Sequence, residues 1–156
     1  MQIHSLELED FSDSNYTLIG IHAVLEEFKL AYVLNETLNT KFVRADYNLD
    51  FENKNNNASF SIYEFRNKKF SHDWFLISNT YIDETVNEPQ GFFTSNQIKT
   101  YLISEKKNID YFLKLEGGFQ EQYVLEIIEK IKSVHQVITA YLVDHHTLKS
   151  KDFLIF

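Results

Sequence analysis

The feature that most constrains the fold is a strict alternation of residue types just before Gly117-Gly118. Ile109, Tyr111, Leu113 and Leu115 alternate with Asp110, Phe112, Lys114 and Glu116. Successive side chains of a strand point to opposite faces, so the pattern predicts a strand with its first set facing the core. The two glycines end this strand.

An amphipathic helix is predicted over residues 119–134, directly after the glycines. Its apolar stripe consists of Tyr123, Val124, Ile127, Ile128 and Ile131. Acidic and basic residues occupy the remaining positions, as expected for a helix packed on a sheet by one face. Residues 137–143 then read as a buried strand, and Asp144-His145-His146 closes it.

The first third of the chain predicts a short strand over residues 3–8 and then helices. Apolar residues recur at helical spacing over residues 21–28 and again over residues 29–39. The two stripes are offset, so we expect two short helices, and one bent helix fits the same pattern.

The middle of the chain has the period of strands. Residues 42–44 and 47–51 predict one strand or two short ones, and the polar run 52–57 predicts a turn. Residues 59–65 and 72–78 are rich in aromatic and branched side chains, and they are joined by residues 66–70. This pair predicts a hairpin.

Residues 79–97 contain the only proline, Pro89, and no regular element is expected there. Phe92 and Phe93 follow in a predicted loop. If the two rings are exposed, they offer a contact surface. The alternative is that both rings are buried at the edge of the core. Phe153 and Phe156, in the apolar C-terminal tail, are candidates for the same role, because such tails usually dock on the sheet or on a partner.

These elements predict an α+β fold: a mostly antiparallel sheet of about five or six strands, with N-terminal helices and one long helix from the C-terminal half packed on it. With 156 residues, one proline and 4 glycines, the chain is expected to form a single domain over residues 1–156.

Composition excludes several classes of function. The net charge of -8, with basic residues in scattered pairs, disfavours nucleic-acid binding. The chain has no cysteine, so it forms no disulfide. We expect no membrane span, because no apolar run approaches roughly 20 residues, and no signal peptide. The expected location is the cytoplasm.

No catalytic motif is visible in the sequence. The nucleophile elbow, the phosphate-binding glycine loops and the zinc-binding histidine spacings are all absent. His145 and His146 are adjacent, so their side chains point apart and seldom reach one metal. We therefore predict no catalytic residues, no metal and no cofactor, and we do not expect an enzyme.

Residues 103–111 read I-S-E-K-K-N-I-D-Y. This stretch resembles the signature of the IPExxxVDY family of small Bacteroidetes proteins, with Ile103, Glu105, Asp110 and Tyr111 matching. Ser104 stands in place of the family's proline, which loses a fixed φ in the turn, and Ile109 in place of its valine. Residues 18–21, 29–35, 76–79 and 139–156 also resemble the family.

The resemblance implies a bacterial cytosolic protein of unassigned function, with no catalytic residues to carry over. The motif can be structural: a turn, an Asp110 that accepts hydrogen bonds, and an inward Tyr111 whose hydroxyl needs a partner. It can also be a binding motif, and the structural interpretation is favoured.

Two functional hypotheses follow. The first is a protein that acts through protein–protein contacts, including self-association as a homodimer, motivated by an aromatic content of 15% and the apolar tail. The alternative is a small-molecule binder or small enzyme, with a pocket near Glu105, Asp110, Tyr111 and His145.

Overall fold

A computed structural model describes residues 15–52, 57–83 and 98–156 of the chain. Its main feature is a six-stranded antiparallel sheet in the order β2-β3-β4-β7-β1-β8. The strands are β1 Tyr16–Ala23, β2 Val43–Glu52, β3 Asn57–Asn67, β4 His72–Ser78, β7 Tyr111–Glu116 and β8 Val137–Val143. A smaller antiparallel pair joins β5 Thr80–Asp83 to β6 Ile98–Tyr101. The predicted α+β class is confirmed.

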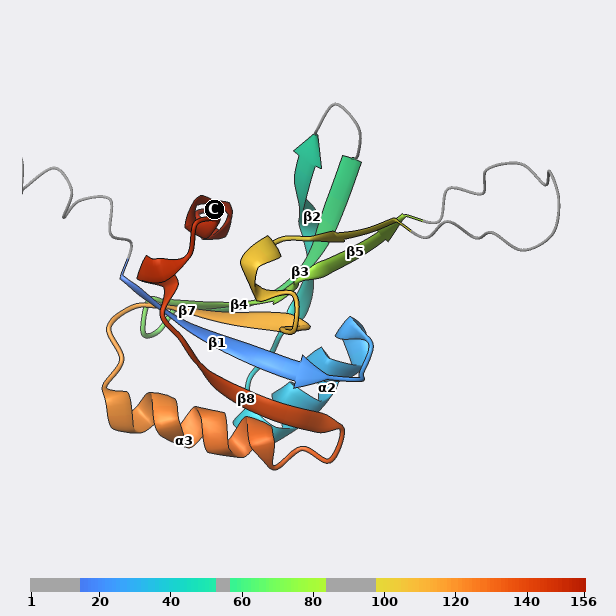
Figure 1. The fold of residues 1–156 in the computed structure, drawn as a ribbon. Coiled ribbons are helices and arrows are strands. Elements are labelled where there is room, and N and C mark those ends of the chain that lie inside the picture. The colour runs from blue at the N-terminus through green and yellow to red at the C-terminus, as the bar shows by residue number, and fades with distance from the viewer. Residues whose placement is uncertain (1–14, 53–56, 84–97) are drawn as a thin grey trace, which may run out of the picture.

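Two helices, α2 Glu27–Leu38 and α3 Glu121–Lys132, lie on the same side of the sheet (Figure 1). Leu30 and Leu34 of α2 and Ile127 and Ile131 of α3 are buried in one apolar cluster with the sheet. The sheet residues of that cluster include Ile19, Ile21, Trp74, Leu76, Leu113, Leu115 and Ala140. We call this side the helix face.

The opposite side of the sheet is covered by irregular chain, and we call it the loop face. The cover includes the segment around the 3-10 turn η1 (Ser104–Lys106) and the C-terminal tail with the turns η2 (His145–Thr147) and η3 (Lys151–Leu154). A second apolar cluster lies under it, with Ile103, Ile109, Leu148 and Leu154 from the cover. From the sheet it takes Leu18, Phe60, Ile62, Phe75, Ile77, Phe112 and Val143.

β7 lies between β4 and β1, and both of its faces are buried. The prediction of one inward face was therefore wrong: Phe112 and Lys114, assigned to the outer set, are buried under the cover of the loop face. The strand begins at Tyr111, two residues later than predicted.

The first predicted helix was also wrong, because residues 16–23 form β1. β1 pairs with β7 on one side and β8 on the other, and its apolar run is typical of a strand buried on both faces. A Cβ at Gly20 would lie 2.8 Å from Ile109 Cδ1, so a larger residue at this position would displace the end of the Ile109 side chain. α2 takes the place of the second predicted helix.

Of the remaining predictions, some are confirmed and others are wrong. The hairpin β3–β4 and the helix α3 are confirmed, although α3 spans 12 residues and is shorter than predicted. β2 is one strand whose pairing with β3 shifts between Arg44 and Asn48. β8 was predicted to be buried but is an edge strand, and β5 is regular where no element was expected. Residues 3–8, 53–56, Phe92 and Phe93 lie outside the described residues.

Candidate functional site

The signature segment wraps around one buried side chain, that of Asn79, at the end of β4. Asn79 Nδ2 donates to the carbonyl oxygens of Lys106 (2.9 Å) and Ile109 (2.8 Å), and its Oδ1 accepts from the Ile103 N–H (2.8 Å). Its backbone N–H donates to the Asp110 carbonyl, and its carbonyl accepts from the Leu102 N–H. Asn79 is fully buried, so it satisfies backbone groups that water cannot reach.

Glu105 holds the C-terminal tail. Its Oε1 accepts the Ser150 N–H and its Oε2 accepts the Ser150 hydroxyl, both at 2.8 Å. Partial burial disfavours the charged carboxylate, but these hydrogen bonds outweigh it and lower the pKa of Glu105. Ile103, the first residue of the motif, is fully buried on the loop face.

Asp110 and Tyr111 hold the region where β1 leads into α2. Asp110 Oδ2 accepts the Ala23 N–H at 2.9 Å, where the β1–β8 register shifts. The Tyr111 hydroxyl donates to the Leu25 carbonyl at 2.6 Å, with its ring in the cluster of the helix face. Burial raises the pKa of this hydroxyl, so it acts as a neutral donor.

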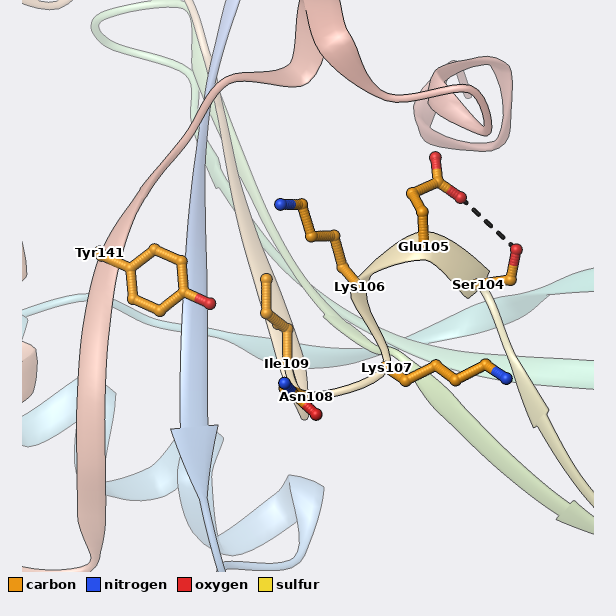
Figure 2. Close-up of a pocket in the computed structure, with 7 residues that line it drawn as sticks. All are labelled: Ser104, Glu105, Lys106, Lys107, Asn108, Ile109 and Tyr141. Atoms are coloured by element: carbon orange, nitrogen blue, oxygen red, sulfur yellow. Dashed lines mark hydrogen bonds between the residues drawn. The ribbon is translucent and has the colours of Figure 1, made fainter.

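The motif residues therefore point to different places. A pocket of about 340 Å³ is lined by Ser104, Glu105, Lys106, Lys107, Asn108, Ile109 and Tyr141 (Figure 2). Of the four side chains that the pocket hypothesis brings together, only Glu105 lines it. Tyr111 lies on the helix face, and His145 stacks on Tyr16 with its ring centroid 3.9 Å away.

The pocket has the size of a small-ligand site. In Figure 2 the Lys106 and Lys107 side chains extend in different directions, and the Tyr141 ring stands across from Ile109. The Tyr141 hydroxyl lies 2.9 Å from His22 Nε2, which fixes the ring. This arrangement can hold a polar molecule by hydrogen bonds. The Ser104 hydroxyl in its lining donates to Glu105 Oε2 at 3.5 Å (Figure 2).

Lys114 is a buried lysine whose position the sequence did not indicate. Its Nζ donates to the Leu154 carbonyl (2.6 Å) and pairs with Glu116 Oε1 (2.9 Å). The same Nζ lies 4.3 Å from the ring centroid of Phe156 and within 6 Å of the rings of Tyr16 and Phe75. Cation–π attraction strengthens with desolvation, so Lys114 fastens the tail to the sheet.

The candidate contact residues of the tail are partly used inside the molecule. Phe153 packs edge-on against Phe51, with ring centroids 4.6 Å apart, and Phe156 against Phe75 at 5.1 Å. Both rings keep part of their surface exposed, whereas Leu154 is fully buried. The tail is thus docked on the sheet, and its outer surface remains accessible.

Among the remaining exposed apolar side chains, some form two groups, and the others are spread over the rest of the described surface. One group lies on and just before α2, where Phe28 and Tyr32 share one helix side and Val24 is exposed in the bend before the helix. The other lies on β8, where Ile138 is 71% exposed and Leu142 is 54% exposed. Neither group was singled out from the sequence, because periodicity assigned both segments to the core.

Within the described ranges, no three His, Asp or Glu side chains gather into a possible metal site. In the same part of the chain, none of the helices has the length and apolar character needed to span a bilayer. No protein-family model matches the chain, and no curated protein matches it.

Proposed function

We propose that this protein acts through protein–protein contacts, beginning with its own association into a homodimer. The observation that carries the proposal is the grouping of exposed apolar side chains on α2 and β8. Single exposed apolar residues are ordinary on protein surfaces, whereas grouped ones mark contact sites. An IPExxxVDY-family protein working in the bacterial cytoplasm is the setting that the signature at residues 103–111 supports.

The geometry of the signature favours this function over catalysis. Glu105, Asp110 and Tyr111 each bind a backbone or side-chain group of a distant segment: Ser150, Ala23 and Leu25 respectively. Their hydrogen-bonding capacity is used to hold the fold, so these residues are positioned to shape a surface. The contact chemistry is then supplied by the apolar groups elsewhere.

The test is the molar mass of the purified protein, measured by light scattering after size-exclusion chromatography over about 1 to 100 μM, because association depends on concentration. A mass of two chains supports the proposal. A single-chain mass throughout this range overturns it.

The pocket between η1 and Tyr141 favours a second candidate, the binding of a small polar molecule. A screen of small anions and polar metabolites by thermal melting would test it, with Tyr141→Phe as the variant that removes a pocket hydroxyl. Stabilisation of the wild type that is reduced in the variant supports the pocket, and equal melting shifts in both proteins contradict it.

A further inference from the structure

β8 is an edge strand whose pairing with β1 is irregular at its start, where Ile138 is skipped between Val137 and Thr139, and regular from Thr139 to Val143. Among the described residues it pairs only with β1, so alternate backbone N–H and C=O groups along its outer side point away from the sheet. Its sequence, VITAYLV, contains no charge, no proline and no glycine. Natural edges are commonly blunted by charges, and an unprotected apolar edge is a template for pairing with another chain.

The other edge, β2, carries the charged residues that β8 lacks. β2 carries Arg44, Asp46 and Asp50, and its pairing with β3 is interrupted between Arg44 and Asn48. The Arg44 guanidinium donates to the carbonyls of Ala45 (2.9 Å) and Ile62 (3.1 Å) and so holds the interruption in place. Charges on an edge strand disfavour pairing with another strand, so β8 is the more favourable edge for such pairing.

The side of α3 next to β8 extends the same surface. Tyr123 stacks on Phe119, and Phe119 contacts the Trp74 ring of β4, so this side of α3 faces the middle of the sheet. The opposite side, by helical spacing, carries Leu125, Glu121 and Lys132 and faces the free edge. Leu125 is exposed there, which adds an apolar contact beside Ile138 and Leu142.

We propose that β8 pairs antiparallel with β8 of a second copy of this chain, which joins the two sheets into one across a twofold axis. This inference rests on the proposed function and names the surface that performs it. A second copy fits because an antiparallel pair of identical strands is self-complementary: full overlap of the regular part, Thr139–Val143, places Tyr141 on the axis and Thr139 opposite Val143 of the second copy.

Charge complementarity also selects a second copy. α3 begins with Glu121 and ends with Lys132, and the twofold axis makes the two α3 helices antiparallel neighbours on one face. Glu121 of one helix then approaches Lys132 of the other, whose Nζ also pairs with Glu129 of its own helix at 3.3 Å. Strand pairing alone buries little area, and these flanking contacts add to it.

The first experiment compares the wild type, Leu142→Lys and Tyr32→Lys by light scattering, with circular dichroism to confirm that each variant is folded. Both replaced side chains are more than half exposed, 54% and 62%, so the monomer tolerates either lysine. We expect a dimer for the wild type and for Tyr32→Lys, and a monomer for Leu142→Lys. A dimer that Tyr32→Lys dissociates and Leu142→Lys does not overturns the β8 interface but leaves the proposed function standing. A monomeric wild type overturns both.

The second experiment tests the register with cysteine cross-links, which is simple because the chain has no cysteine. Thr139→Cys and Val143→Cys are purified separately and mixed under oxidising conditions. The mixture should give a disulfide-linked dimer, because paired residues lie about 5 Å apart. Each variant alone should give none, because the same position in the two copies is displaced by about 13 Å along the strands. Cross-linking by a single variant, or none in the mixture, overturns the full-overlap pairing.

Discussion

The two faces of the sheet are covered in different ways. The helix face is covered by two regular helices through apolar contacts, with Leu30, Leu34, Ile127 and Ile131 buried against the strands. The loop face is covered by irregular chain, which brings many backbone groups into the interior. Those groups are satisfied by a few polar side chains, chiefly Asn79 and Lys114. A regular cover needs only apolar spacing, whereas an irregular cover depends on single residues.

The largest loss of stability is expected from Asn79→Ala, which tests whether the loop face depends on single residues. The change leaves the Ile103 N–H and the carbonyls of Lys106 and Ile109 without their partner in a dry environment. We expect the free energy of unfolding to fall by about 3–5 kcal/mol, since each buried unpaired group costs about 1–3 kcal/mol. Urea denaturation measures the loss.

The matched control for Asn79→Ala is Asn67→Ala, whose Oδ1 accepts one exposed hydrogen bond from the Lys69 N–H. Its effect should stay below about 1 kcal/mol, because water replaces an exposed partner. Equal losses in the two variants would show that the loop face does not depend on Asn79.

The next effect is expected from Lys114→Met, which keeps an unbranched side chain but removes the ammonium. The Leu154 carbonyl loses its donor and Phe156 loses its cation. We expect a loss of about 1–3 kcal/mol, the range for a hydrogen bond to a charged group. Amide hydrogen exchange should rise in residues 148–156 and remain unchanged in α3. Equally faster exchange in both regions would contradict the view that Lys114 stabilises only the docking of the tail.

A smaller effect is expected on the helix face, where the Tyr111 hydroxyl makes a hydrogen bond within a mainly apolar layer. Tyr111→Phe keeps the ring and removes the 2.6 Å hydrogen bond to the Leu25 carbonyl, so stability should fall by about 1 kcal/mol. Tyr123→Phe, on the exposed part of α3, is the control and should change stability by less than about 0.5 kcal/mol. Thermal unfolding distinguishes the two variants. Equal shifts in melting temperature would mean that the Tyr111 hydroxyl does not stabilise the fold.

The smallest effect is expected from Glu105→Gln, and it should depend on pH. Since the folded state lowers the pKa of Glu105, the ionised carboxylate stabilises the fold above its unfolded pKa of about 4.3. This contribution is lost as the pH falls through the lower, folded pKa. The difference in stability between wild type and variant should therefore be constant above about pH 5 and shrink in more acidic buffer. A double-mutant cycle with Ser150→Ala measures the coupling, and a difference independent of pH contradicts the assignment.

The same comparison explains what the sequence could predict. α3 and the hairpin β3–β4 were predicted because one regular period runs through each of them. β1 was assigned to a helix because a short apolar run, buried on both faces, fits either period. Pairing with β7 and β8 decides its structure, and those strands lie far along the chain.

Single residues of the loop face left no periodic signal. Lys114 occupies a polar position in an alternating pattern, which indicates solvent, yet the tail covers it. Asn79 lies in a segment where only a break was expected. For the signature residues, the sequence favoured a structural role for Glu105, Asp110 and Tyr111, and the hydrogen bonds identify what each one holds. That identification required the path of the whole chain.

The position of β1 also bears on how the protein is made. Tyr16 pairs with Glu116, and Ala23 pairs with Val137, so this strand emerges from the ribosome long before either neighbour exists. At about 5–20 residues per second the delay is on the order of 5–20 s. β2, β3 and β4 pair in sequence and can form a meander meanwhile. Leu18, Ile19 and Ile21 therefore stay unpaired on the nascent chain until β7 and β8 have been synthesised, and during this interval β1 is a segment that a chaperone would need to protect.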